Sequence, residues 1–352
     1  MKCDVLVVGA GPAGCAAAFF LKYFDKDDEL NVTLVERLTK DKFDIYHSIC
    51  GEVISEDCFN DIKPIKPTAI VERIRYLKDL WPGKIENTMK TNGYVLDRPR
   101  FLENIINWYE KIGGNFKVEN ISDFSQNRNK VVVKFSKGTV RRFDYVVAAD
   151  GANSMFRKTL GIQGGRITPV IQYVVDEEPI HDTLFFYYDE KYKGDYSWVF
   201  PNGCTKKIGF PLLKNLAYAG KFLTKQTRVI GYGGVDRFIN GRILLVGDAA
   251  CQTNALTKGG IRSGMNAAKM AAEAVIERNL DRYEKRWVLS YYASPLFNKA
   301  FERLSRMNNQ ELNRHIKPFA GGYGIRSYFI SRLFYREYAD IYKAYEISNI
   351  GW

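Results

Sequence analysis

Histidine is scarce in this sequence, which has only three in 352 residues. They are His47, His181 and His315, and none has sequence neighbours that suggest a general base. The six cysteines form no Cys-x-x-Cys pair and no metal-ligand spacing; they are Cys3, Cys15, Cys50, Cys58, Cys204 and Cys251. These gaps argue against a zinc or disulfide scaffold. No metal site is therefore predicted, and a reducing, cytoplasmic compartment is favoured.

Long apolar runs are also missing. The uncharged stretch from Val5 to Leu21 is shorter than the roughly 20 residues that a membrane-spanning helix needs. It contains three glycines and a proline at the spacing of a turn motif. It is therefore interpreted as a strand, a turn and a helix rather than as a signal peptide or an anchor.

No nucleic-acid-binding motif accompanies the net charge of +12. Lys and Arg are scattered along the chain, so a solvated basic surface is the simplest explanation, and attraction to an anionic lipid surface is the alternative. Aromatic residues make up 14% of the chain, with 22 Tyr and 22 Phe. This share fits either an aromatic core or the lining of a large apolar cavity.

Three glycine-bearing segments, each after an apolar strand-like run, carry the main signal. In the first, Gly9-Ala10-Gly11-Pro12-Ala13-Gly14, the first glycine permits a tight turn. The second glycine lets the backbone approach a pyrophosphate, and the third lets a helix pack on a strand. The helix predicted for residues 14–22 would then direct its N-terminus toward the negative charge.

Glu36 ends the second predicted strand, residues 31–36, of this unit. An acidic residue at that place binds ribose hydroxyls. With the first strand at residues 3–8, the order is strand, helix, strand and acid, which predicts dinucleotide binding. Arg37 is a candidate for contact with a phosphate or with the adenine, or is plain surface charge.

The second segment is Ala149-Asp150-Gly151-Ala152-Asn153-Ser154, with Arg157 close behind. The third is Leu245-Val246-Gly247-Asp248-Ala249-Ala250, followed by Gly260-Ile261 and a helix predicted for residues 264–278. Asp248 is expected to accept a ribityl hydroxyl, and the helix start places N–H groups where flavin reduction builds negative charge. All three segments in this order predict an FAD-dependent oxidoreductase.

The remaining pattern predicts a fold of the α/β class in which a Rossmann-like FAD-binding domain is interleaved with an antiparallel-sheet substrate domain and followed by a helical tail. Further predicted elements are a helix at 102–111, strands at 130–135, 142–148 and 242–246, an antiparallel sheet over 166–213, and helices from 281. The predicted domains are 1–160 with 225–290 for FAD (residues 50–95 contributing partly to the substrate side), 161–224 for substrate, and a C-terminal helical segment over 291–352.

Three more segments carry a family resemblance. They are Tyr196-Ser197-Trp198-Val199-Phe200-Pro201, the Cys-Gly segment His47–Ser55, and Tyr94–Phe101, which contains Arg98. Together with the glycines they resemble the geranylgeranyl reductase family, within the para-hydroxybenzoate hydroxylase (GR2) type of flavoprotein fold. The resemblance covers about residues 1–290 and includes the family's YxWxFP motif.

Two departures from that family's pattern stand out. The pair of glycines that follows YxWxFP in the family is reduced to one in Gly209-Phe210-Pro211. The family's Asn-Pro-Leu-Thr-Gly-Gly-Gly-Ile stretch is here Asn254–Ile261, with Ala255 and Lys258 as the changed positions. Lys258 would either place a cation near the flavin or point to solvent.

The motifs and the resemblance together name the candidate site residues. Those predicted to bind FAD are Gly9, Gly11, Ala13, Gly14, Glu36, Arg37, Cys50, Gly51, Val53, Arg98, Ile121, Asp150, Gly247, Asp248, Gly260 and Ile261. Those predicted at the reacting centre are Cys50, Tyr196 and Trp198. The resemblance implies that Cys50 is a proton donor or a wall of the site, with a small buried residue as the alternative. Tyr196 and Trp198 are expected to shape the cavity.

The resemblance implies an enzyme that reduces carbon–carbon double bonds of geranylgeranyl chains in membrane lipids or their precursors, with hydride from reduced FAD. No second nucleotide motif follows a strand, so electrons would come from transiently bound NAD(P)H or from ferredoxin. The tail after Ser327 interleaves aromatics with arginines. This pattern is typical of a helix at a membrane surface, and equally of a helix that packs on the core or closes the cavity. The expected location is cytoplasmic, with peripheral membrane contact as an open alternative.

Two other functions fit the same pattern. One is a flavin-dependent monooxygenase or halogenase, although a halogenase would have Trp in place of Tyr196 and Ile-Pro in place of Phe200-Pro201. The other is a flavoprotein redox carrier without a lipid substrate. A carrier needs an exposed flavin edge, whereas a lipid reductase needs a long apolar cavity.

Overall fold

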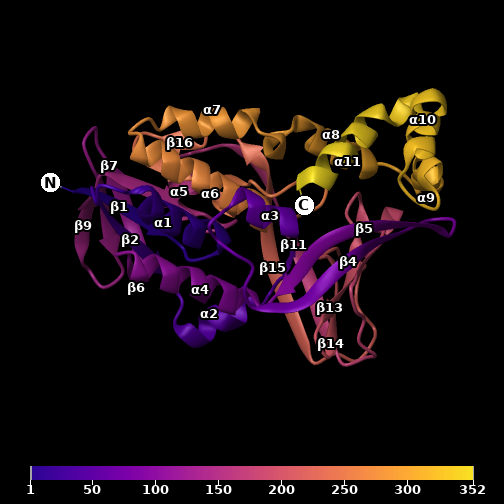
Figure 1. The fold of residues 1–352 in the computed structure, drawn as a ribbon, viewed down its shortest axis with the longest axis horizontal. Helices are drawn as coiled ribbons and strands as arrows, with labels where there is room; N and C mark the ends of the chain where they lie inside the picture. The colour runs from indigo at the N-terminus through magenta and orange to yellow at the C-terminus, as the bar shows by residue number, and fades with distance from the viewer. Residues whose placement is uncertain (1, 352) are drawn as a thin grey trace.

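Two large β-sheets and a group of C-terminal helices make up the fold in the computed structural model, which describes residues 2–351 (Figure 1). The first sheet has the strand order β16-β17-β10-β1-β2-β6, and all neighbouring strands are parallel except β16 and β17. Its strands are β1 (Cys3–Val8), β2 (Leu30–Glu36), β6 (Asn115–Val118), β10 (Tyr145–Ala148), β16 (Ile239–Asn240) and β17 (Ile243–Leu245). Residues 5–8 of β1 and all of β17 are apolar and buried, as is typical of a parallel sheet whose two faces are both covered.

Helix α1 lies between α4 and α6 on this sheet. Small side chains let the helices approach closely, among them Ala17 of α1 and Ala268 of α6, which are fully buried. The helices of this part are α1 (Pro12–Phe24), α2 (Lys40–His47), α3 (Glu56–Asp61), α4 (Arg98–Lys111), α5 (Met155–Thr159), α6 (Ile261–Ile276) and α7 (Asp281–Leu289).

The helices predicted over residues 14–22, 102–111 and 264–278 are present, and each begins earlier than predicted. α1 begins at Pro12, whose missing N–H costs nothing at a first helical position. α4 begins at Arg98 because the Asp97 side chain caps it, accepting a hydrogen bond of 3.2 Å from the Arg100 N–H. α6 begins at Ile261, directly after Gly260.

The strand predicted over residues 142–148 is two strands that belong to different sheets. β9 (Val140–Phe143) pairs with β8 (Val131–Phe135), which pairs with β7 (Ile121–Gln126) in a small antiparallel sheet. β10 enters the first sheet instead. Asp144 stands at the change of sheet, where its carboxylate accepts a hydrogen bond of 2.8 Å from the Asp4 N–H.

The second large sheet has the strand order β15-β11-β14-β13-β12-β4-β5-β3 and is antiparallel except between β12 and β4. It contains the antiparallel sheet predicted over residues 166–213 and is wider. Its strands are β3 (Val53–Ser55), β4 (Ile70–Trp81), β5 (Ile85–Leu96), β11 (Gly164–Val175), β12 (Thr183–Tyr187), β13 (Ser197–Asn202), β14 (Thr205–Pro211) and β15 (Thr224–Val235). The predicted return to the FAD-binding part at residue 225 falls at the start of β15, which pairs with β11 over most of its length.

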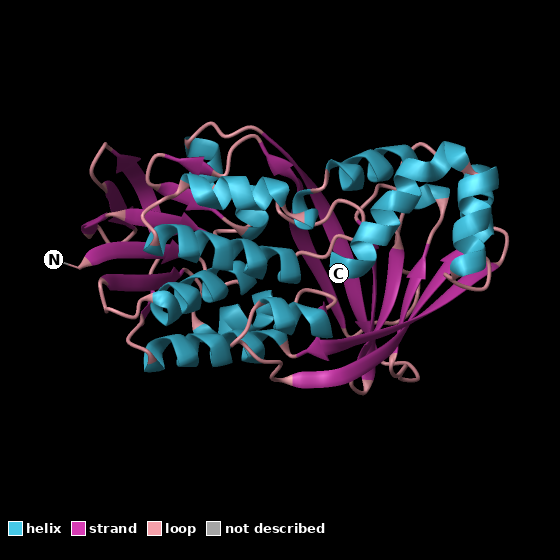
Figure 2. Ribbon diagram, turned by 45° about the horizontal axis from the view of Figure 1, so that its top comes forward, coloured by secondary structure: helices cyan, strands magenta, loops and turns pink. Residues whose placement is uncertain are grey.

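The C-terminal helices cover one face of the second sheet (Figure 2). They are α8 (Pro295–Leu304), α9 (Asn309–Ile316), α10 (Ile325–Phe334) and α11 (Ala339–Gly351), in agreement with the predicted helical tail. Buried side chains of α8, α9 and α11 form a core of their own with Trp81 of β4. The tail is thus joined to the sheet by packing.

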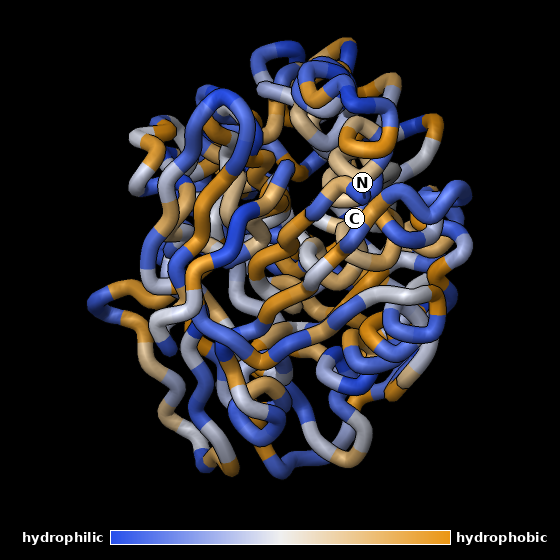
Figure 3. The backbone as a smooth tube through the Cα atoms, turned by 90° about the vertical axis from the view of Figure 1, so that its left-hand side faces the viewer, coloured by the Kyte–Doolittle hydropathy of each residue, from blue (hydrophilic) through white to orange (hydrophobic). Residues whose placement is uncertain are grey.

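Hydrophobic stretches run through the middle of the molecule, and many outer loops are hydrophilic (Figure 3). The largest core surrounds the first sheet and includes α1, α4 and α6. Within residues 2–351, none of the helices has the length and apolar character needed to cross a bilayer.

Candidate functional site

A cavity of about 340 Å³ lies where the two large sheets meet. This is at the lower end of the ~300–1,000 Å³ range of small-molecule sites. Residues of all three glycine segments line it, namely Gly11, Ala13, Gly151, Ala152, Gly247 and Asp248. The aromatic side chains of Tyr196, Trp198 and Phe200 line it from the second sheet. Segments far apart in the sequence therefore share one space.

The first glycine segment forms a tight turn between β1 and α1. Gly9 has φ +93°, and a Cβ there would lie 2.5 Å from the Ala149 carbonyl oxygen. A Cβ on Gly14 would lie 1.7 Å from the Gly9 carbonyl oxygen. These two glycines are needed by the fold itself, since backbone occupies the space that a side chain would take.

Gly11 differs from its two neighbours in the motif. A Cβ there would meet only the His47 ring, at 3.7 Å, and the residue lines the cavity. A side chain at this position would therefore project into the cavity. This open backbone is the kind of surface that a pyrophosphate needs.

Glu36 holds the turn from outside the cavity. Its carboxylate accepts hydrogen bonds of 2.8 Å from the Ala10 N–H and 3.0 Å from the Leu38 N–H. The side chain is buried and lies at the end of β2, as the sequence predicts.

Arg157 connects the second glycine segment to the third. Its guanidinium donates hydrogen bonds to the carbonyl oxygens of Ala152, Ala249 (2.8 Å) and Asp248 (3.2 Å). Ser154 caps α5 by accepting a hydrogen bond of 3.0 Å from the Arg157 N–H. The buried Arg157 side chain thus fixes the two loops relative to each other.

Asp248 presents the one carboxyl of the third segment to the cavity. It accepts a hydrogen bond of 2.9 Å from the Thr253 hydroxyl. Burial raises the pKa of this carboxyl, against the opposing effect of Arg228. Gly260 and Ile261 at the start of α6 also line the cavity, so the helix N-terminus faces the same space.

The loop that carries Cys50 is held by hydrogen bonds from an amide and an ammonium group. The Cys50 carbonyl oxygen accepts hydrogen bonds of 3.1 Å from both the Gln172 amide and the Lys207 ammonium group. Lys207 also forms an ion pair with Glu52, and both side chains are buried. Cys50 itself is partly exposed and lines the cavity.

Arg98 also braces this loop. Its guanidinium donates hydrogen bonds of 2.6 Å to the His47 carbonyl oxygen and 3.4 Å to the Ile49 carbonyl oxygen. Burial lowers the pKa of the His47 imidazole to about 2, so His47 is neutral. Arg98 lines the cavity as well.

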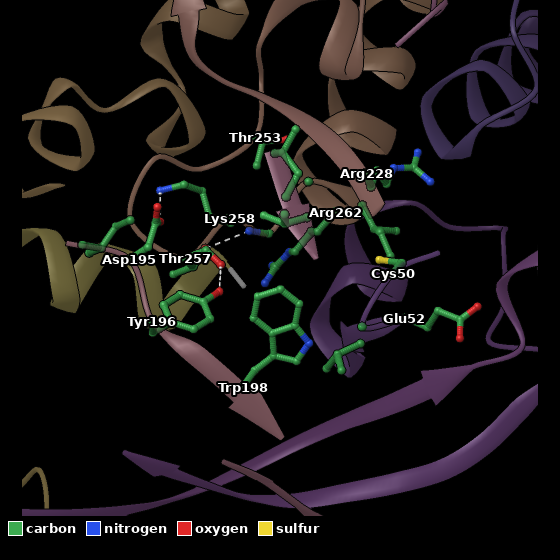
Figure 4. Close-up of a pocket in the computed structure, with 18 of the residues that line it drawn as sticks. Cys50, Glu52, Asp195, Tyr196, Trp198, Arg228, Thr253, Thr257, Lys258 and Arg262 are labelled. Carbon is green, nitrogen blue, oxygen red and sulfur yellow. Dashed lines mark hydrogen bonds and ion pairs between the residues drawn. The ribbon is translucent and has the colours of Figure 1, made fainter. Parts of the chain in front are cut away.

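Tyr196 and Trp198 rise from β13 and the turn before it, between Cys50 on one side and Asp195 on the other (Figure 4). The Tyr196 hydroxyl donates a hydrogen bond to the Thr257 carbonyl oxygen. Two glycines leave space for the aromatic side chains of β13 that line the cavity. A Cβ on Gly209 would lie 2.1 Å from the Trp198 indole, and one on Gly51 would lie 2.7 Å from the Phe200 ring.

The glycine that is retained after the YxWxFP segment, Gly209, lies within a strand. Gly209 lies in β14 directly opposite Trp198, so it serves packing rather than a turn. Lys258, the other departure, does not point to solvent. Its ammonium group pairs with Asp195 at 2.6 Å, lies 3.8 Å from the centre of the Phe301 ring, and its side chain is 8% exposed.

The structure brings together most of the predicted site residues. Those that line the cavity are Gly11, Ala13, Cys50, Gly51, Val53, Arg98, Tyr196, Trp198, Gly247, Asp248, Gly260 and Ile261. Six others lie outside its lining. Gly9, Gly14 and Glu36 shape the first turn, Asp150 is half-buried and accepts a hydrogen bond from the Met155 N–H, Arg37 is exposed, and Ile121 is buried in β7.

Several polar residues of the cavity were not predicted from the sequence. Asp79 on β4, Asp195 and Arg228 line it, as do Tyr323 and Tyr345 of the C-terminal segment. The alternation Leu77-Lys78-Asp79-Leu80-Trp81 carried a signal for Asp79, because it places the carboxyl on the same strand face as two apolar side chains. The tyrosines reach the cavity only through tertiary packing.

The fold of the chain is that of flavin-dependent enzymes. A geranylgeranyl bacteriochlorophyll reductase-like protein from Thermoplasma acidophilum superposes with a TM-score of 0.81 at 20% identity, over 96% of this chain and 98% of that one. CmlS, a flavin-dependent halogenase, superposes with a TM-score of 0.67 at 16% identity, over 98% of this chain and 72% of that one. No protein-family model matches the sequence.

Curated relatives in sequence agree with the motifs. The chain is 26% identical over 333 residues to the digeranylgeranylglycerophospholipid reductase of Methanothrix thermoacetophila, covering 82% of this chain and 83% of the relative. It is 29% identical over 364 residues to digeranylgeranylglycerophospholipid reductase 2 of Methanopyrus kandleri, covering 89% of each. With the three glycine segments and the YxWxFP residues facing one cavity, these likenesses support the resemblance to the geranylgeranyl reductases.

Proposed function

We propose that this protein is an FAD-dependent reductase that saturates carbon–carbon double bonds in the geranylgeranyl chains of membrane lipids or their precursors. One observation carries the proposal: the dinucleotide-type turns and an aromatic, mostly apolar sheet floor line the same cavity. A flavin ring and an isoprenoid chain would have to bind side by side in order to react, and these two surfaces adjoin each other. The relatives named digeranylgeranylglycerophospholipid reductase support the lipid class.

The cavity residues fit FAD. Gly11 offers open backbone to a pyrophosphate, and Asp248 offers a carboxyl to a ribityl hydroxyl. Gly260 and Ile261 would bring the N-terminus of α6 to the flavin, and Glu36 would approach the ribose from the end of β2. In this proposal, residues 1–160 and 225–290 form the FAD-binding part and 161–224 the substrate part, to which β15 adds a strand.

Bound FAD, once reduced, would supply the hydride. The chain's own residues would hold the alkene in a dry space, because an unactivated double bond offers no carbonyl whose charge the protein could stabilise. Tyr196, Trp198 and Phe200 would fix the position of the chain. The Cys50 thiol would supply the proton or form a wall. NAD(P)H or ferredoxin would bring the electrons.

The decisive test is anaerobic reduction of a defined lipid. The flavin-loaded protein is reduced with dithionite, mixed with a geranylgeranyl-bearing phospholipid, and the lipid is analysed by mass spectrometry. The proposal predicts mass increases in steps of one H2. An unchanged lipid in the presence of reduced flavin would contradict it, and oxygen incorporation under air would favour a monooxygenase instead.

The role of Cys50 is tested separately by Cys50→Ala and Cys50→Ser. A proton donor predicts a loss of rate of about 100-fold in Cys50→Ala, with partial recovery in Cys50→Ser. A cavity wall predicts similar, smaller losses in both. Cys204→Ala is the matched control, because Cys204 is exposed and does not line the cavity.

Peripheral contact with an anionic membrane surface is part of the proposal. Helix α10 exposes Ile325 (80%), Phe329 (58%) and Phe334 (72%), and Arg326 and Arg332 lie on the same helix. Apolar side chains flanked by arginines suit insertion between anionic headgroups. α11, in contrast, packs its buried side chains into the core, and Tyr345 lines the cavity.

Sedimentation with vesicles tests this contact. Binding to vesicles with an anionic phospholipid should exceed binding to zwitterionic ones, and Phe329→Ser with Phe334→Ser should reduce it. Equal binding to both kinds of vesicle, or no effect of the two substitutions, would contradict membrane contact through α10.

A further inference from the structure

Asp79 is a lone carboxyl on the apolar floor of the cavity. It lies on β4 between Leu77 and Trp81, which share its strand face, and all three line the cavity. Its partners across the neighbouring strands are Asn87 of β5 and Phe186 of β12. Among residues 2–348, whose side chains the structure describes, none forms an ion pair or a hydrogen bond with this carboxyl. Asp79 is half-buried, and a carboxyl that is largely removed from water without a partner costs free energy that a bound ligand can recover.

Aromatic side chains surround this end of the cavity. Tyr188 stacks on Trp81 with ring centres 3.7 Å apart and planes 3° from parallel. Tyr323 and Tyr345 come from the C-terminal segment. Burial raises the pKa of all three tyrosine hydroxyls, and the nearby Asp79 carboxylate adds to the effect. The hydroxyls therefore remain protonated, and the carboxyl is the acidic group of this end.

Tyr345 adds an acceptor to the carboxyl. The Nδ1 atom of His315 lies 2.7 Å from the Leu312 carbonyl oxygen, so this nitrogen carries the hydrogen. Its Nε2 atom, 3.1 Å from the Tyr345 hydroxyl, must then accept that hydroxyl's hydrogen. Burial lowers the pKa of His315 to about 4, which keeps the ring neutral. The Tyr345 oxygen is left as a hydrogen-bond acceptor.

The cationic side chains of the cavity are held by groups other than Asp79. Lys258 is paired with Asp195, Arg262 with Asp61, and Arg98 and Arg228 donate to the carbonyls of the Cys50 loop. None of the four contributes to the pKa of Asp79. A phosphate placed beside Asp79 would meet a carboxyl and no cation. The polar group that fits here donates hydrogen bonds and carries no negative charge.

We propose that Asp79, with Tyr188, Tyr323 and Tyr345 around it, forms a subsite for a hydrogen-bond-donating, non-anionic end group of an isoprenoid chain, a hydroxyl or a protonated amine. The subsite would fix how far the chain extends along the cavity and thereby which double bond lies at the reacting centre. This inference rests on the proposed function for the isoprenoid class of its ligand. A hydroxyl would donate to the carboxyl, and an ammonium group would add charge pairing and contact with the aromatic faces.

Binding of three probes tests the subsite without turnover. The probes are geranylgeraniol, geranylgeranylamine and the C20 hydrocarbon with the same double bonds but hydrogen in place of the polar group. Trp81 and Trp198 line the cavity, so quenching of tryptophan fluorescence in the oxidised, flavin-loaded protein reports occupancy. We expect both polar probes to bind about tenfold more tightly than the hydrocarbon, since one buried hydrogen bond contributes about this much.

Substitutions then assign the preference to Asp79. Asp79→Leu should abolish the advantage of both polar probes and leave hydrocarbon binding equal or tighter. Asp79→Asn keeps size and an acceptor, so it should retain most of the alcohol's advantage and lose the amine's further gain. Glu86→Leu is the matched control. It removes an exposed carboxyl from the neighbouring strand, outside the cavity, and should leave the order of the probes unchanged.

Equal binding of the three probes to the unsubstituted protein would overturn the subsite, as would equal changes for all probes in Asp79→Leu. If Asp79→Leu does not fold, the ratio of amine to alcohol binding in Asp79→Asn decides. The lipid reduction assay remains separate. Asp79-dependent binding without reduction would refute the proposed function and keep the subsite, and reduction without polar preference would do the reverse.

Discussion

The Lys258 ammonium group and the Asp195 carboxylate lie 2.6 Å apart in the wall of the cavity, with side chains only 8% and 13% exposed. Burial lowers the pKa of Lys258 and raises that of Asp195, and in each case the partner's charge opposes the shift. The Lys258 ammonium group also lies over the rings of Phe301 and Tyr232. The departure from the family's glycine at this position is thus compensated by a specific partner.

Removing only one member of this pair should destabilise the protein. Lys258→Met leaves a buried carboxylate without its cation, which costs about 3 kcal/mol. The double variant Lys258→Met with Asp195→Asn removes both charges and should recover most of that loss. Urea unfolding of the two single variants and the double variant gives the coupling energy. A coupling energy near zero would show that the pair contributes nothing to folding.

Two glycines of the first motif should respond differently to alanine. Gly14→Ala places a methyl group on the Gly9 carbonyl oxygen, so the apoprotein itself should lose about 3 kcal/mol or fail to fold. Gly11→Ala meets only the His47 ring and faces the cavity. Its apoprotein should unfold like the unsubstituted protein, while its affinity for FAD falls about tenfold or more.

Flavin content after purification and thermal unfolding of the apoproteins measure these two effects. Unaltered FAD binding in Gly11→Ala would contradict the assignment of this turn to the pyrophosphate. Normal stability of Gly14→Ala would contradict the close contact of α1 with the turn.

Much of this site could be predicted because its requirements are local. The turn at Gly9, the helix after it and the acid at Glu36 follow from steric and hydrogen-bonding needs within one short unit. The width of the second sheet could not be predicted in the same way. β4 and β12 pair in parallel although about 100 residues separate them, and pairing of that kind leaves little trace in the local pattern.

Polar residues of the cavity were missed for a related reason. Tyr323 and Tyr345 resemble any other aromatic residue of the tail until α11 packs beside Trp81. Asp79 lies in an alternating strand on the face of Leu77 and Trp81, and a single acid among apolar side chains does not by itself indicate a cavity. The sequence does not reveal that C-terminal helices cover that face. Ile121 is the reverse case. It is predicted to bind the cofactor, and in the structure it is a core side chain of β7 outside the cavity lining.

Arg157 should be critical for joining the second and third glycine segments. Arg157→Gln loses most of the hydrogen bonds to the carbonyls of Ala152, Asp248 and Ala249, so we expect about 2–3 kcal/mol of lost stability and weaker flavin retention. Arg141→Gln is the control, because Arg141 pairs with Glu119 in a partly exposed position and should lose less than about 1 kcal/mol. Equal losses in the two variants would remove the special role of Arg157.

The Tyr196 hydroxyl should matter for position rather than for proton transfer. It donates its hydrogen to the Thr257 carbonyl oxygen, and burial raises its pKa further above 10. Tyr196→Phe should therefore lower the rate of lipid reduction by less than about tenfold and leave the shape of the pH–rate profile unchanged. If one of the titrations seen in the pH–rate profile disappeared in Tyr196→Phe, Tyr196 would instead be identified as the acid.

Asp79 should give the protein's stability a pH dependence that one substitution removes. Burial raises the pKa of this carboxyl from 3.8 to about 7. Between these values the folded state holds a proton that the unfolded state has released. The contribution of Asp79 to the free energy of unfolding is therefore most favourable at low pH and falls as the pH rises toward 7. The tyrosines around Asp79 stay protonated over this range, and His315, whose pKa is about 4, is neutral from pH 5 upward.

Asp79→Asn cannot lose a proton, so the variant should gain stability relative to the unsubstituted protein as the pH rises from 5 to 8. Each unit of pKa difference corresponds to about 1.4 kcal/mol, so the relative gain should exceed ~1 kcal/mol. Other titrating groups, including Asp195 and Lys258 in the cavity wall, are the same in both proteins and cancel in the difference. Urea unfolding at pH 5, 6, 7 and 8 measures it. A difference independent of pH would mean that the carboxyl ionises at its ordinary pKa, and the cavity end at Asp79 would then be open to water.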